Sequence, residues 1–103
     1  MKEVGSITNS KMQFYKLEKK NKLVVLICRT LYNIDNGDVV GRISEGFRPT
    51  EQYWISCVGE DSAGGEIENF GIATFATNGN ISVEFHNGTS TFSYAAIFAS
   101  YFV

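Results

Sequence analysis

The chain has 103 residues, 44% of them hydrophobic and 19% charged, which fits a single globular domain with one core. A formal net charge of −2 and a pI near 5.3 leave no basic field for phosphates and argue against a nucleic-acid partner. Residues 1–6 carry an early acid and no run is long enough to cross a bilayer, so the sequence predicts neither a signal peptide nor membrane insertion.

The first third of the chain reads as a polar leader followed by two strands. Residues 1–10 are interpreted as a leader or linker remnant, and residues 11–103 as the folded domain. An outer strand is expected over 11–17, followed by a charged turn at 18–21. The run 23–28 is β-branched, apolar on both parities and too short for a typical helix, which predicts a central strand covered on both faces.

The middle of the chain contains a turn and then a corner. Asn36-Gly37 is the expected tip of a turn, because both residue types tolerate positive φ. Gly46-Phe47-Arg48-Pro49 holds the only proline, which fixes its own φ and pushes Arg48 into an extended conformation. We expect this segment to form a corner that leads into a strand over 53–58.

A hairpin is predicted between two apolar runs at 69–75 and 81–85. Asn78-Gly79 lies between them, and an Asn-Gly pair in this position favours a type I′ turn with positive φ at both residues. The second run alternates in polarity. Its expected inward residues are Ile81, Val83 and Phe85, and its outward ones are Ser82, Glu84 and His86.

The last run, 92–103, is apolar on both parities, so it is not expected at the edge of a sheet. Short strands separated by Asn/Gly turns, without a helical period, predict an all-β fold. The expected architecture is a single antiparallel β-sandwich, of jelly-roll or Greek-key type, with about seven to eight strands. If an isolated sandwich leaves one parity of 92–103 uncovered, a subunit contact is the simplest cover, so a homotrimer is predicted.

Catalytic and metal-binding patterns are sparse. His86 lies on a polar parity without any metal-ligand or nucleophile spacing around it. The acids Glu60, Asp61, Glu66 and Glu68 share one Gly-rich loop, which is read as solvated, with an acid/base pair as the alternative. No metal or cofactor is therefore predicted. Cys28 and Cys57 lie in apolar strands and are expected to be buried free thiols, a disulfide being the alternative.

Aromatic side chains are abundant, with one tryptophan, five tyrosines and eight phenylalanines. Some are expected at a surface covered by a ligand or a subunit, and dense core packing is the alternative. The residues proposed to bind a saccharide are Trp54 or Tyr53 as stacking surface, with His86 and Asp61 as polar partners. For Trp54, a place in the core or in a subunit interface is the competing interpretation.

The order of these parts resembles the C-terminal head domains of phage tail fibres and receptor-binding proteins. The residues that carry the resemblance are Phe14-Tyr15-Lys16-Leu17, the apolar run 23–28, the corner phrase 41–49, the hairpin 72–81 and the final aromatic strand. In that group the corner phrase commonly has a proline where this chain has Ser44. The resemblance covers residues 11–103, and its motifs are structural corners.

The resemblance implies a non-enzymatic homotrimeric head that recognises a host cell-surface polysaccharide or wall polymer. It implies a place at the virion tail tip, or in the bacterial cytoplasm for a prophage product. Two other functions stay open at this point: a structural trimerisation cap of a fibre, and a small glycan hydrolase that uses the loop from Glu60 to Glu68.

Overall fold

The computed structural model describes residues 2–31, 34–35, 37–60, 67–85, 91–92 and 94–103, and every regular element in this part of the chain is a strand. The all-β prediction is therefore confirmed. The long strands are β3 (Met12–Lys20), β4 (Leu23–Thr30), β6 (Val39–Ile43), β7 (Tyr53–Glu60), β8 (Ile67–Phe75), β9 (Asn80–Phe85) and β11 (Tyr94–Phe102). The short ones are β1 (Lys2–Val4), β2 (Ile7–Thr8), β5 (Ile34–Asp35) and β10 (Thr91–Phe92).

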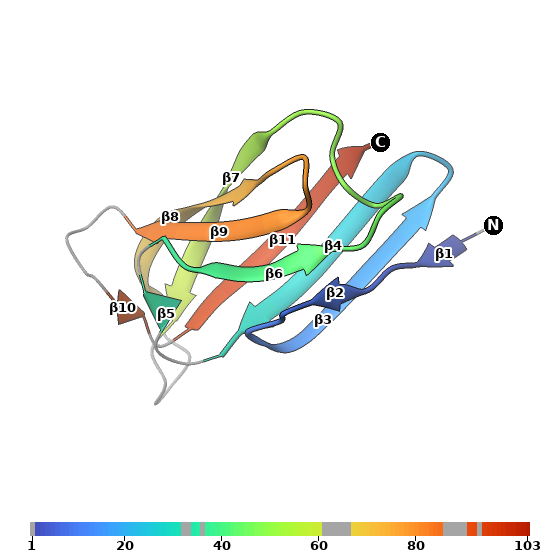
Figure 1. Cartoon of the computed structure of the whole chain (residues 1–103). Coiled ribbons are helices and arrows are strands. Elements are labelled where there is room, and N and C mark those ends of the chain that lie inside the picture. The colour runs from blue at the N-terminus through green and yellow to red at the C-terminus, as the bar shows by residue number, and fades with distance from the viewer. Residues whose placement is uncertain (1, 32–33, 36, 61–66, 86–90, 93) are drawn as a thin grey trace.

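Nine of these strands form one antiparallel sheet in the order β1-β3-β4-β11-β7-β8-β9-β6-β2, while β5 and β10 pair separately. The sheet curls into a half-barrel, so that β6 and β9 pass in front of β4 and β11 in Figure 1. The predicted sandwich of two sheets is not confirmed. Hydrogen bonding continues from one wall to the other, because Tyr94 to Ala96 of β11 pair with Val58 to Glu60 of β7.

The first residues of the chain connect the two edges of this sheet. Strand β1 pairs with β3 at one edge, and β2 pairs with β6 at the other. Between β1 and β2, the backbone N–H of Gly5 donates to the carbonyl of Leu17. After β2, the backbone N–H of Lys11 donates to the carbonyl of Val40. The segment predicted as a leader therefore contributes two strands to the sheet and covers both edges.

The core lies between the two walls and follows the alternation of the strands. Its buried residues include Val24 and Leu26 on β4, Ile97 on β11, and Ile81 and Val83 on β9. Glu84 points to solvent as predicted, and the side chains of Phe85 and His86 lie outside the described part. The prediction for β4 is correct only in part: β4 lies between β3 and β11, but only one of its faces is buried.

The predicted corner crosses from β6 to β7, which are not neighbours in the sheet, and three side chains hold it. Lys19 Nζ donates to the carbonyl of Gly46 at 2.8 Å and lies 4.8 Å from the centre of the Phe47 ring. Arg48 Nε donates to the carbonyl of Ile43 at 2.7 Å, and the hydroxyl of Tyr101 donates to the carbonyl of Phe47. These bonds satisfy corner carbonyls that no strand partner reaches.

Two turns differ from their predictions. The hairpin between β8 and β9 forms, but of its two central residues only Gly79 has positive φ, and Gly79 N donates to Ala76 O. The loop thus has three residues and a left-handed glycine, a common alternative to the predicted type I′ turn. The first charged turn begins later than expected, because β3 runs on to Lys20 and the positive φ falls on Asn21.

Two of the three left-handed glycines, Gly37 and Gly79, give a matched test of this packing. Both have positive φ, so alanine should cost about 1–2 kcal/mol at each position. A Cβ at Gly79 would also lie 2.5 Å from the carbonyl oxygen of Ile43, whereas a Cβ at Gly37 meets nothing within 4 Å. In urea unfolding we expect Gly79→Ala to lose about 1–3 kcal/mol more than Gly37→Ala. Equal losses would contradict the close approach of the hairpin to β6.

Candidate functional site

The two predicted aromatic site residues lie on opposite faces of β7. Successive residues of a strand point to opposite sides, so Trp54 faces outward with 60% of its surface exposed, while Tyr53 faces the core and is half-buried. They cannot form one stacking platform. Asp61 and His86, their predicted polar partners, lie outside the described residues.

Tyr53 belongs to an aromatic cluster inside the half-barrel. Its ring stacks on Phe75 with centroids 5.0 Å apart, and Tyr101 lies 5.3 Å away. Burial raises the pKa of the Tyr53 hydroxyl above its ordinary value of 10.0, and this hydroxyl has no hydrogen-bond partner among the described residues. These contacts give Tyr53 a packing role, and only Trp54 of the pair is available to a ligand.

Trp54 begins a mixed row of side chains on the outer side of β7, β8 and β9. It lies opposite Thr74, which in turn lies opposite Ser82. The next outward row runs from Ser56 through the partly exposed Ile72 to the exposed carboxylate of Glu84. We call this surface the outer polar face: Trp54, Ser56, Thr74, Ser82 and Glu84. An exposed indole beside hydroxyls and a carboxylate can stack on a sugar ring and bind its hydroxyl groups.

The other wall of the half-barrel is apolar on the outside. Its outward residues on β3, β4 and β11 form what we call the outer apolar face: Phe14, Leu23, Val25, Ile27, Phe98 and Phe102. The most exposed are Phe102 at 72%, Phe98 at 68% and Phe14 at 52%. Large exposed apolar surfaces on soluble proteins commonly mark interaction sites.

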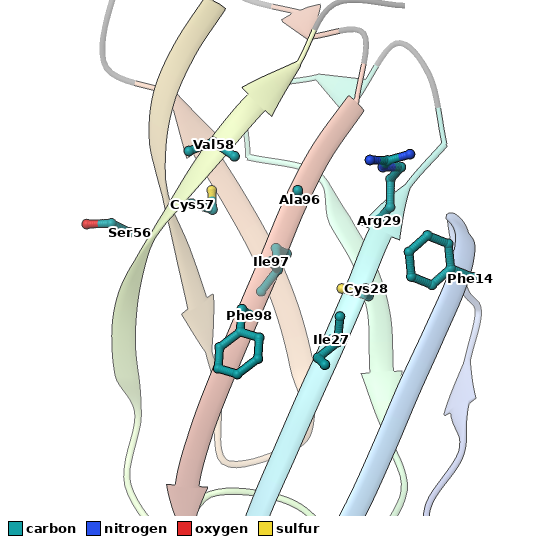
Figure 2. A pocket seen from close by; sticks show the side chains of 10 residues that line it. All are labelled: Phe14, Ile27, Cys28, Arg29, Ser56, Cys57, Val58, Ala96, Ile97 and Phe98. Atoms are coloured by element: carbon teal, nitrogen blue, oxygen red, sulfur yellow. The ribbon is translucent and has the colours of Figure 1, made fainter. Parts of the chain in front are cut away.

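A shallow hollow of about 420 Å³ opens on this apolar face and extends to Ser56 and Val58 on β7, where it borders the outer polar face. Figure 2 shows Phe14, Ile27, Arg29 and Phe98 around it, with Phe98 beside its lower end. The guanidinium of Arg29 lies 5.0 Å from the centre of the Tyr94 ring, a cation–π geometry that places one positive group in a mostly apolar lining. A second depression, of about 490 Å³, lies between Leu23 and Phe102 and extends the apolar face toward the turn after β3.

Paired charges border the outer apolar face along β1 and β3. Glu18 lies 2.7 Å from Lys2 Nζ and 3.3 Å from Lys16 Nζ. The hydrogen bond from Lys2 lowers the pKa of the Glu18 carboxyl, and Lys16 lowers it further. The border of the apolar face is therefore polar, and its opposite charges neutralise one another in part.

Sequence reasoning found some of these residues and missed others. It noted that 92–103 is apolar on both parities and predicted a subunit contact there, and exposed Phe98 and Phe102 lie on this strand, although neither was named as a site residue. Phe14 and Arg29 were missed. The outward direction of Phe14 on β3 follows only from the burial of Leu17 on the same strand, and that of Arg29 on β4 follows only from the burial of Leu26.

The two thiols are inward-facing and free, as predicted. Burial raises the pKa of Cys28 from 9.0 to about 12, with a further rise from nearby Cys57, and burial raises that of Cys57 to about 11. Thiols in this state are poor nucleophiles at neutral pH. No group of three or more histidine, cysteine or acidic residues that could hold a metal occurs in the described ranges, and the acids from Asp61 to Glu66 lie outside them.

No protein-family model matches this chain, and no curated protein matches it. Within the part of the chain that the structure describes, no helix is long and apolar enough to span a bilayer.

The buried thiols predict a specific alkaline loss of stability. Their folded pKa values lie above the ordinary 9.0, so the stability they contribute is complete below pH 9 and falls as the pH rises toward 11 and 12, because the unfolded chain releases protons that the folded chain keeps. Between pH 8 and pH 10 the free energy of unfolding should fall by about 1.4 kcal/mol for each thiol.

Urea unfolding at the two pH values measures this loss, and the single variants Cys28→Ala and Cys57→Ala are the controls. Each variant should show a loss smaller by about 1.4 kcal/mol than that of the parent chain, since lysines that titrate in the same range are common to both. Identical pH dependence in parent and variants would mean that the thiols are not buried as described.

Proposed function

We propose that this chain is a non-catalytic recognition head that binds a saccharide or wall polymer on a bacterial surface and acts as a homotrimer. The observation that carries the proposal is Trp54, an exposed indole on a rigid strand, in register with the hydroxyls of Thr74 and Ser82. The likeness of the sequence to fibre head domains supports the same function.

The outer polar face suits a saccharide because its groups are complementary to the two kinds of surface that a sugar presents. The indole of Trp54 offers a flat apolar surface for the C–H face of a pyranose. Ser56, Thr74 and Ser82 offer hydroxyls that donate and accept, and Glu84 offers an acceptor. Because β7, β8 and β9 are paired along most of their length, these groups are held in place before a ligand arrives, which limits the entropy lost on binding.

Three copies on one head would strengthen a weak site. A single shallow site of this type is expected to bind a sugar weakly, and linking several on one rigid assembly raises the overall affinity by avidity. The location that we propose for the protein is the tip of a virion tail fibre, or the cytoplasm of a bacterium that makes the fibre from a prophage.

The purely structural cap is the second candidate, since the outer apolar face would serve self-association without any ligand. The small glycan hydrolase is the other candidate, and its residues Asp61 and Glu66 lie outside the described part.

The binding function is tested with a glycan array and host-wall oligosaccharides, followed by titration of the best ligand. We expect Trp54→Ala to weaken binding by roughly tenfold to thirtyfold, the range for losing a central aromatic contact. Trp54→Phe should keep part of the affinity, and Val4→Ala, an exposed apolar residue on β1 at the far edge of the other wall, is the control.

Three results would contradict the proposal in different ways. Binding that neither quenches nor shifts Trp54 fluorescence would remove Trp54 from the site. Turnover of cell-wall polysaccharide that is lost in Glu66→Ala or Asp61→Ala would favour the hydrolase. If the chain neither binds nor hydrolyses any of the host-wall ligands, the structural cap is the remaining candidate.

A further inference from the structure

We propose that the outer apolar face is the surface through which copies of this chain associate. The inference rests on the proposed homotrimer and adds which side of the half-barrel forms the contact. It assigns the two outer faces to different partners: the apolar face to a second copy of the chain, and the outer polar face to the ligand.

Most of the exposed apolar residues lie on one wall, and Val39 on β6 and Trp54 on β7 are the exceptions. Outward positions of β4 and β11 carry mainly aliphatic side chains and phenyl rings, with Phe14 beside them on β3, while the remaining outward residues of β3 are charged. On β9 and β6 the outward residues include Ser82, Glu84 and Arg42. Strand β11 shows the difference most clearly, because inward Ile97 and outward Phe98 are consecutive and both apolar. A strand that faced only water on this side would be expected to carry polar residues there.

The area of the face matches what an association between copies requires. Phe14, Phe98 and Phe102 are 52%, 68% and 72% exposed, and an aromatic side chain covers roughly 150–250 Å², so the three rings alone leave on the order of 400 Å² of apolar surface uncovered. Leu23, Val25 and Ile27 add to this. A standard interface buries about 800 Å² per partner, of which about 60% is apolar, or nearly 500 Å².

The shape of the face fits a partner that carries the same features. Phe98 projects beside the hollow of about 420 Å³, so the surface holds a bulky ring and an apolar recess next to each other. A copy of the chain can place its Phe98 in the recess of its neighbour while the paired charges around Glu18 stay at the border. This arrangement, an apolar centre with a polar rim, is the usual anatomy of a subunit interface.

The test compares two aspartate substitutions of outward apolar residues by sedimentation equilibrium from nanomolar to high micromolar concentration. Phe98→Asp should weaken self-association by roughly a hundredfold or more, because it removes a central ring and would bury an unpaired carboxylate. Val39→Asp, on the outer side of β6, is the matched control and should associate like the parent chain. A cooperative urea transition in each variant, measured at a concentration at which the parent chain is dissociated, would show that the variant is folded.

Phe14→Asp, on β3, provides an independent variant of the same face should Phe98→Asp fail to fold, and the same loss is expected. A parent chain that stays monomeric at high micromolar concentration overturns the proposal, and so does association unchanged in both face variants. A monomeric parent chain would also contradict the proposed homotrimer. Unchanged association of both face variants would contradict only the assignment of the outer apolar face to the contact.

Ligand binding separates this inference from the proposed function. Phe98→Asp should keep the affinity of each site for a monovalent oligosaccharide while losing avidity for a surface coated with it, and Trp54→Ala should associate normally. Loss of monovalent binding in Phe98→Asp would contradict the division of the two faces. Failure of every chain to bind saccharide, with association lost only in the face variants, would reject the ligand and retain the interface.

Discussion

The structure depends on one constraint: an antiparallel sheet has two edges whose backbone groups need partners. In this chain a single short segment serves both, since β1 pairs with β3 and β2, two residues later, pairs with β6. This is possible only because the sheet curls far enough to bring β3 and β6 near each other. Gly5 lies at the crossing point, where a Cβ would approach Leu17 and Phe47 to less than 3 Å.

The corner after β6 has a related task. It crosses between two strands that are not neighbours, so its carbonyls have no ladder to enter. Lys19 and Tyr101 donate to the corner carbonyls of Gly46 and Phe47, and Arg48 within the corner donates to Ile43, the last residue of β6. The phrase Gly-Phe-Arg-Pro therefore carries structural and not catalytic information: its glycine adopts a positive φ, its phenylalanine is buried, and its arginine bonds back to the strand just completed.

Local features of the fold could be predicted from the sequence, and long-range ones could not. Alternation identified Ile81 and Val83 as core, and the Asn-Gly pair located the hairpin, since both signals lie within a few residues. Among the described residues, three residue pairs between β7 and β11 make the sheet continuous. No local sequence pattern predicts this pairing. In the candidate site Trp54 and Tyr53 were alternatives chosen by their chemistry, and the period of two that puts neighbours on opposite faces leaves Trp54 as the exposed one.

The position of β11 has a consequence for how the protein is made. This strand lies in the middle of the strand order, between β4 and β7, although it follows the other strands of the sheet in the sequence. Until its residues leave the ribosome, β4 and β7 each lack a neighbour, and the two walls can be joined only through the segment that holds β1 and β2. The nascent chain must therefore hold an incomplete sheet, and this sheet can be completed only after β11 is translated.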